Sequence, residues 1–538
     1  MNNSCIWRYN FEILELDGDA NLSGAGNASD NTIYGNQGDN IILGLTGSDT
    51  LLGGAGGDSL DGGSEDDHLY GGQGSDTLSG GAGVDYLYGE ADNDRYIIDD
   101  PLDSIFDDSG SDDVIEAYVN VDLSAFSGVE NIELYGSASE AIGDGFDNDL
   151  YGNPSLASEL IGGAGNDMLM TYDTADTLDG GLGDDLMYGG NANDLYIVDS
   201  TGDRASDNQG HDTIHGYANI DLADHVGIDF VELKGAATSV FGDSSSTTLI
   251  ANQSLGSELS GQGGHDTLVG LSGDDTLDGG SGVDSLSGGA GDDLYLNVDS
   301  SDVISENASD GIDTIHTSLA SYSLPSQIEN LQLTGGLHSS GYGNELSNQL
   351  AGNSGDNFLD AGSGDDTLGS IDASGADTLV GGWDDDVYYL NHSGITINEF
   401  SGEGHDLIHS WVDFILPFGV EDLTLHGLNQ LTGEGNRFNN LLVDDTTTSV
   451  ELYGHEGDDT LIGGGGNDIL VGGAGDDLYH LVDDGASLVE LDFGGHDIVL
   501  VDHAVSSFTL SPYIEEVYLL SSPASLSGNN LNNLLSGT

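Results

Sequence analysis

Aspartate recurs at every ninth residue over long stretches of this chain, always at the same place in a glycine-rich unit. Between residues 26 and 97 the chain divides without a gap into eight nonapeptides, among them GGAGGDSLD at 53–61 and GGQGSDTLS at 71–79. In most units Gly comes first, Asp is sixth and an aliphatic residue is eighth. Carboxylate and carbonyl oxygens are the ligands that hard divalent cations prefer. The spacing therefore indicates metal binding.

The glycines explain how the aspartates are brought together. Glycine allows positive φ and close approach of backbones, so the first six residues of a unit are predicted to turn tightly with their carbonyls inward. The next three are predicted to form a short strand with one apolar residue inside. Two units then make one full turn, and equivalent aspartates stack at roughly the 4.8 Å spacing of neighbouring strands.

Stacked carboxylates repel one another, so a cation is expected between them. Ca²⁺ accepts six to eight oxygen ligands in flexible geometry, whereas Mg²⁺ requires a strict octahedron and retains water. A ligand set of oxygens, with neither Cys nor regularly spaced His, disfavours zinc and copper. We expect about ten calcium ions or more, each held between two turns.

The candidate calcium ligands are the sixth-position aspartates of five blocks of repeats. In chain order they are Asp49, Asp58, Asp67, Asp76, Asp85, Asp94, Asp167, Asp176, Asp185, Asp194, Asp266, Asp275, Asp284, Asp293, Asp366, Asp377, Asp386, Asp459, Asp468 and Asp477. The fourth block is displaced by an insertion of Ser370 and Ile371.

Some units lack the aspartate. Asn31, Asn40 and Asn357 replace it at the start of blocks, where we expect weaker sites or caps. The units at 152–161 and 251–260 have no sixth-position acid and carry an extra residue, so no metal is predicted there.

A second, longer element separates the blocks. It begins with an aromatic strand such as DLYIVDS (194–200), continues with a Gly-x-Asp segment such as GHDTIH (210–215), and ends with an alternating strand such as IENLQLTG (328–335). Period-two patterning rich in Ile, Val, Leu and Tyr predicts half-buried strands. We call this element the connector.

These observations predict an all-β fold, a parallel β-roll or β-helix solenoid of calcium-binding nonapeptide blocks joined by β-rich connectors. Repeats of this kind stack so that each contacts mainly its neighbours. The expected boundaries are 1–25 for an incomplete connector, then a block plus connector at 26–142, 143–241, 242–342, 343–434 and 435–527, and a truncated next block at 528–538.

The amino-acid composition limits the classes of molecule that the chain is expected to bind. The chain has 97 acidic residues against 5 Lys and Arg, a formal net charge of −92. Nucleic acid and anionic lipid are polyanions, so neither is an expected partner. No apolar stretch reaches the ~18 residues that a spanning helix requires, so membrane insertion is not expected. Cys5 is the sole cysteine, which excludes an intrachain disulfide.

Two histidine motifs and several paired acids resemble catalytic groups. HDTIH (211–215) and HDLIH (405–409) have the spacing of a zinc-protease helix, but the surrounding pattern predicts no helix there. Adjacent acids such as Asp66 and Asp67, or Asp184 and Asp185, would act as acid and base only in a cleft. We therefore predict that the chain is not an enzyme.

The nonapeptide GGxGxDxLx resembles the repeat of RTX (repeats-in-toxin) proteins, and the connectors are similar to those in large bacterial exoproteins and in the repeat modules of alginate epimerases. The resemblance implies calcium held by the aspartates and glycine carbonyls, a secreted bacterial protein, and export through a type I secretion system. Two functions remain open: a structural or adhesive extracellular segment, or the accessory region of a secreted enzyme (alginate epimerase or metalloprotease) or toxin whose active domain lies outside this chain. Neither a receptor nor a polysaccharide ligand is indicated.

Overall fold

The structure is a computed structural model that describes residues 4–6, 12–107, 112–307, 310–369, 374–399, 404–491, 494–502, 505–520 and 525–537. The described chain forms two compact units, Met1–Asp275 with Gly279–Ser285 and Thr276–Asp278 with Leu286–Thr538. Apart from two short 3-10 turns, Leu123–Ala125 and Leu222–Asp224, the regular elements of the described ranges are strands. None of the described segments forms a helix long and apolar enough to cross a membrane.

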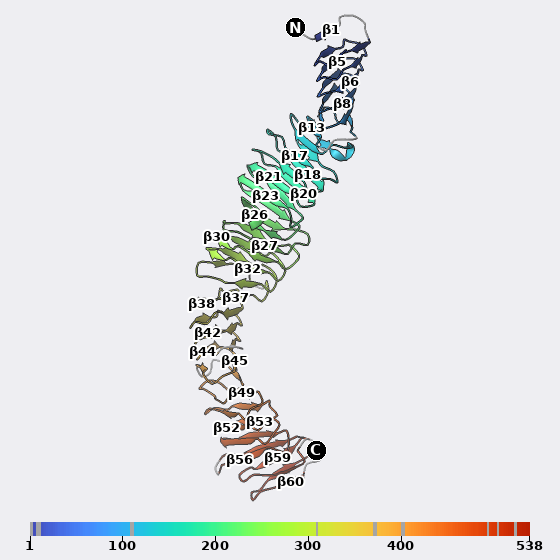
Figure 1. Cartoon of the computed structure of the whole chain (residues 1–538). Coiled ribbons are helices and arrows are strands. Elements are labelled where there is room, and N and C mark those ends of the chain that lie inside the picture. The colour runs from blue at the N-terminus through green and yellow to red at the C-terminus, as the bar shows by residue number, and fades with distance from the viewer. Residues whose placement is uncertain are drawn as a thin grey trace. The chain divides into compact units, whose positions relative to one another are not determined.

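The first block of the first unit is a two-sided parallel solenoid, with its strands stacked as rungs (Figure 1). Successive strands alternate between two sheets, so each strand pairs with the strand two positions later. Leu51 lies opposite Leu69, and Leu69 opposite Leu87. One side consists of β5 Ile41–Thr46, β7 Ser59–Ser64 and β9 Thr77–Ala82, and the other of β6 Thr50–Ala55, β8 His68–Gln73 and β10 Tyr86–Ala91. Two nonapeptides therefore make one turn, and the predicted fold class is confirmed.

The strands are longer than the three residues expected from the sequence. β6 runs through the end of one nonapeptide and into the glycines of the next, where Gly54 pairs with Gly72. The reason is steric: Gly72 has a φ of +116°, and a side chain there would collide with the carbonyl oxygen of Gly54. The expectation of a six-residue turn is wrong, because glycine lets the backbones of neighbouring turns pair.

The core is a row of eighth-position aliphatic side chains. These residues are between 0 and 1% exposed in the first block: Ile33, Ile42, Leu51, Leu60, Leu69, Leu78 and Leu87. Burial of each stabilises the fold by roughly 1.5–3 kcal/mol. Residues on either side of them point outward, which leaves the core one side chain deep on each sheet.

The connectors continue the solenoid. After the first block, β11 Arg95–Ile98, β13 Val114–Ala117, β15 Asn131–Leu134 and β17 Asp149–Tyr151 pair in that order in one parallel sheet. The second unit repeats the arrangement in β35 Leu294–Leu296, β37 Thr314–Thr317, β39 Asn330–Leu333 and β41 Gln349–Ala351. Alternate residues of β39 are buried, as the period-two pattern predicted. Ser370 and Ile371 and part of 1–25 lie outside the described residues.

Candidate metal centre

The sixth-position aspartates form two ladders in the first block, one along each edge of the solenoid. The backbone N–H of Asp49 donates to Oδ1 of Asp67 at 2.6 Å, and the N–H of Asp67 donates to Oδ1 of Asp85 at 2.8 Å. On the other edge, Asp58 donates to Asp76 at 2.6 Å and Asp76 to Asp94 at 2.7 Å. Each carboxylate is thereby tied to the backbone of the preceding turn. We call these rows the aspartate ladders.

The second oxygen of the ladder carboxylates has a different environment. Within the described ranges, Oδ2 is buried without a hydrogen-bond partner in Asp49, Asp58, Asp67, Asp76, Asp85, Asp94, Asp167, Asp185, Asp194, Asp266, Asp366, Asp386, Asp459, Asp468 and Asp477. An unsatisfied buried polar atom destabilises a fold by about 1–3 kcal/mol, and more when it is charged. A row of such atoms requires a cation or protons to compensate it.

The space beside these oxygens is lined by backbone carbonyls. A methyl group placed on Gly44 would collide with both Oδ2 of Asp49 and the carbonyl oxygen of Gly62. The same pair of oxygens, one from an aspartate carboxylate and one from a glycine carbonyl, recurs around Gly53, Gly162 and Gly454. Carboxylate and glycine carbonyl oxygens thus converge on one gap between turns. This donor set fits calcium, which takes several oxygens without strict geometry.

Burial also changes the protonation of the ladders. It raises the pKa of Asp49 to about 6, of Asp67 to about 7 and of Asp76 to about 8, while the backbone N–H bonds to these carboxylates lower it. Neighbouring ladder aspartates raise the pKa of Asp67 and Asp76 further. The charged form is therefore disfavoured until a cation is present.

All twenty candidate aspartates are between 0 and 3% exposed. Ladder bonds in the later blocks join Asp167 to Asp185, Asp176 to Asp194, Asp266 to Asp284, Asp366 to Asp386 and Asp459 to Asp477, at 2.7–2.9 Å. Asp275, Asp377 and Asp468 accept from Ser257, Asn357 and Val450, and Asp293 donates to Asp313. Their role as metal ligands stays a prediction.

The turns without aspartate are satisfied differently. Oδ1 of Asn31, Asn40 and Asn357 accepts a local N–H four residues earlier, at 2.8 Å in each case. At the start of the second block, Oγ of Ser158 accepts the N–H of Asn153 at 2.8 Å. These side chains close their own turns, which is the geometry of a cap.

The ladders extend beyond the residues that the nonapeptide pattern identified. Asp85 donates to Asp103 at 3.0 Å, and the last repeat aspartate of a block donates to the aspartate of the connector. These junction bonds join Asp94 to Asp113, Asp194 to Asp212, Asp386 to Asp406 and Asp477 to Asp497, at 2.6–3.0 Å. The Gly-x-Asp segments of the connectors were the signal that could have found most of them.

In the part of the chain that the structure describes, the histidine motifs and the acid pairs lie on strands and turns, not on a helix. His215 lies on β24 Asp212–Gly216 and His409 on β47 Leu407–Ser410. In the pair Asp66 and Asp67, the first side chain is exposed and the second is buried in the ladder. The two carboxylates of such a pair therefore lie in different environments, one in solvent and one in the ladder.

Comparison with known proteins gives two findings. A family model described as the RTX calcium-binding nonapeptide repeat (4 copies) matches residues 25–60, 61–96, 161–196, 260–295, 342–369, 371–391 and 451–480. The endo-1,3-1,4-beta-glycanase ExsH of Rhizobium meliloti (strain 1021) is 36% identical over 73 residues, which are 14% of this chain and 16% of that protein. The matched repeats contain all twenty candidate aspartates.

Proposed function

Because the chain is an RTX calcium-binding repeat protein, we propose that it is a calcium-dependent structural or adhesive segment of a secreted bacterial protein. The observation that carries this proposal is the row of buried ladder oxygens without hydrogen-bond partners, as in Asp49, Asp67 and Asp85. In a chain with a formal charge of −92, calcium is the cation that we propose to compensate these oxygens.

Calcium would act as a signal of location. Extracellular calcium modules have dissociation constants on the order of 10⁻⁴ to 10⁻³ M. At the micromolar calcium of a bacterial interior the chain stays extended, held open by its own charge, and can pass a type I exporter. Outside the cell, millimolar calcium fills the sites between turns, and binding to the folded state supplies folding free energy.

The folding segments would be the five block-plus-connector repeats at 26–142, 143–241, 242–342, 343–434 and 435–527. We expect about ten calcium ions or more in total, since each ion joins two turns. Folding is then cooperative within a block and graded along the chain, as in other solenoids.

The alternative is the accessory repeat region of a secreted enzyme or toxin. The likeness to a protein named as a glycanase favours this second candidate, although it spans only 14% of the chain. Sequencing the DNA on both sides of the coding region separates the two: an adjoining catalytic domain supports the accessory role, and further repeats support the structural one.

Calcium dependence is tested by far-UV circular dichroism and small-angle scattering on the full chain. With chelator we expect a coil spectrum and an extended particle, and with millimolar Ca²⁺ a β spectrum and compaction. Millimolar Mg²⁺ is the matched control and should not restore the β spectrum. A β spectrum that survives chelation would refute the proposal.

A further inference from the structure

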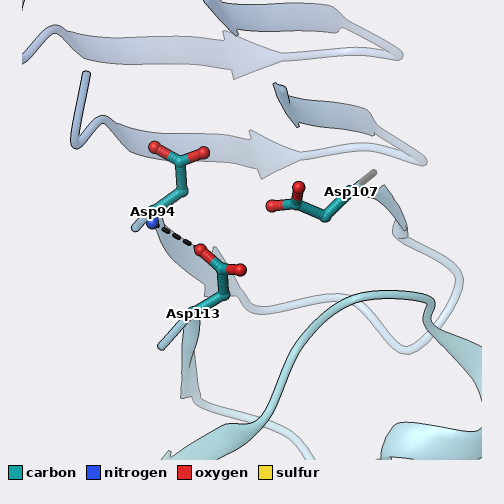
Figure 2. A group of neighbouring side chains, drawn as sticks. All are labelled: Asp94, Asp107 and Asp113. Carbon is teal, nitrogen blue, oxygen red and sulfur yellow. Dashed lines mark hydrogen bonds between the residues drawn. The ribbon is translucent and has the colours of Figure 1, made fainter. Parts of the chain in front are cut away.

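The first block ends at a cluster of three buried acids, one from the last repeat and two from the connector. Oxygens of Asp94, Asp107 and Asp113 lie within 4.8 Å of one another (Figure 2). The same arrangement recurs in Asp194, Asp207 and Asp212, and in Asp477, Glu490 and Asp497. We propose that each of these three clusters, the junction sites, binds an additional Ca²⁺ more tightly than the ladders do.

The buried oxygens point to a ligand. Within the described ranges, Oδ2 of Asp94 and of Asp113 has no hydrogen-bond partner, and the two residues are 2% and 0% exposed. The same holds for the outer pairs of the other clusters, Asp194 with Asp212 and Asp477 with Asp497. Three carboxylates so close repel one another, and a divalent cation removes the repulsion.

A buried tyrosine orients the middle acid of each junction site. The Tyr96 hydroxyl donates to Oδ2 of Asp107, and the Tyr196 hydroxyl donates to Oδ2 of Asp207 at 2.7 Å. Tyr479 donates to Glu490 in the same way. These three tyrosines are 0% exposed. Each therefore holds a carboxylate toward the cluster without reaching solvent.

A glycine leaves room beside the cluster. A methyl group on Gly189 would collide with the Tyr196 hydroxyl and with Oδ2 of both Asp194 and Asp207. Gly89 has the same relation to Tyr96, Asp94 and Asp107. The oxygens thus face one shared gap, as they do around the ladder glycines.

The junction site has its own sequence pattern. In the last nonapeptide of a block, tyrosine replaces the eighth-position aliphatic residue, and an acid follows eleven residues later. The spacing is repeated in the second unit by Tyr295 with Glu306 and Tyr388 with Glu399, where each hydroxyl again donates to the acid. The pattern ties the tyrosine and the acid together at every block end.

The junction sites should bind calcium more tightly than the ladder sites because they carry more negative charge. Around a ladder glycine such as Gly44 the structure brings together one carboxylate oxygen and one glycine carbonyl oxygen. A junction site brings together three carboxylates, the middle one fixed by tyrosine. Calcium affinity rises with the number of charged ligands and with the rigidity of the site. The inference rests on the proposed calcium-dependent folding, and it adds that the junction sites fill first.

The test is calcium binding by equilibrium dialysis on the full chain, from 1 μM to 10 mM free Ca²⁺. The triple variant Asp107→Asn, Asp207→Asn, Glu490→Gln should lose the tightest class of ions and keep the ladder class. The matched control is Asp66→Asn, an exposed acid beside the Asp67 ladder position, which should leave the isotherm unchanged. An isotherm identical to wild type in the triple variant would overturn the inference and indicate that protons hold the acids together.

A second variant tests the junction sites even when the carboxylate triple variant fails to fold. Tyr96→Phe, Tyr196→Phe, Tyr479→Phe keeps every carboxylate and removes only the orienting hydroxyls, so the tight class should weaken about ten- to hundredfold, as is typical for outer-shell partners. Unchanged tight binding in this variant would remove the positioning role. If the wild-type chain binds no calcium at all, the proposed function fails instead, so the two failures are distinguishable.

Discussion

Replacing one ladder carboxylate tests the assigned sites at a single position. Asp67 accepts the N–H of Asp49 and donates its own N–H to Asp85, so it belongs to the sites on both of its sides. Asp67→Asn keeps the Oδ1 acceptor and the side-chain volume but replaces the unpartnered Oδ2 with an amide. Two calcium sites should therefore be lost or weakened together.

The expected loss of stability can be calculated from the free energy of calcium binding. For a dissociation constant of 1 mM and 10 mM free calcium, each ion stabilises the folded state by about 1.4 kcal/mol, and two ions by about 3 kcal/mol. Asp67→Ala also removes the bond from the Asp49 N–H, at a further cost of about 1.5–3 kcal/mol for a hydrogen bond to a charged group. The alanine variant should therefore be the less stable of the two.

Without calcium, Asp67→Asn should have the opposite effect and favour the folded state. Burial raises the pKa of Asp67 to about 7, so at pH 8 its charged form destabilises the calcium-free folded state. The neutral asparagine removes that charge, so in chelator Asp67→Asn should keep its β content to a higher pH than wild type.

The assay measures urea unfolding and calcium stoichiometry in 10 mM Ca²⁺ and, in chelator, the pH at which the β content is lost. Asp66→Asn is the matched control, since this neighbouring acid is exposed and stands outside the ladder. Equal stoichiometry and stability in the two asparagine variants would refute the assigned register.

Three further predictions follow from the same structure. Without calcium, the ladder carboxyls have pKa values raised above 3.8, to about 6 for Asp58 and about 8 for Asp76, so folded β content should be greatest near pH 4 and fall as the pH rises through 6 to 8; a calcium-free spectrum that gains β content on alkalinisation would contradict this. Leu45 is 47% exposed with a φ of +88°, so Leu45→Gly should raise the free energy of unfolding, measured with urea in saturating calcium, by about 1 kcal/mol. Ile41→Gly, at an exposed strand position, should lower it. Leu69 is fully buried between Leu51 and Leu87, so Leu69→Ala should cost about 2–5 kcal/mol in the same assay, and a loss below 1 kcal/mol would show that the core is not packed as described.

The sequence predicted the fold because period nine ties the chemistry to the geometry. When Leu51, Leu60 and Leu69 are each nine residues apart, the aspartates before them must stack as well. The ladder positions in the repeats could therefore be predicted residue by residue. The strand length could not, because the sequence shows where glycine is tolerated but not that the glycines of neighbouring turns pair.

The connector aspartates of the ladders were missed for a related reason. Asp113 follows Asp94 by 19 residues and Asp313 follows Asp293 by 20, so a search in steps of nine ends at the last regular unit. The extra residues lie in the wider connector turn, and the ladder bond between the two aspartates is kept. The position of Asp107 beside Asp94 and Asp113 is visible only in the structure. In the sequence its hydrogen-bond partner Tyr96 looks like an ordinary core aromatic residue.

The turn-by-turn pairing has a mechanical consequence. Each regular turn of the first block contains 18 residues, as the pairing of Thr50 with His68 shows, and adds only about 4.8 Å along the stack. Released and pulled straight, the same 18 residues span roughly 60 Å. A load applied to the two ends of a block would lengthen each turn that detaches more than tenfold. Under the proposed function, each detachment would also break calcium contacts that reform when the tension falls. We expect such a tether to yield in small steps under force, with the surrounding calcium concentration setting the force at which each step occurs.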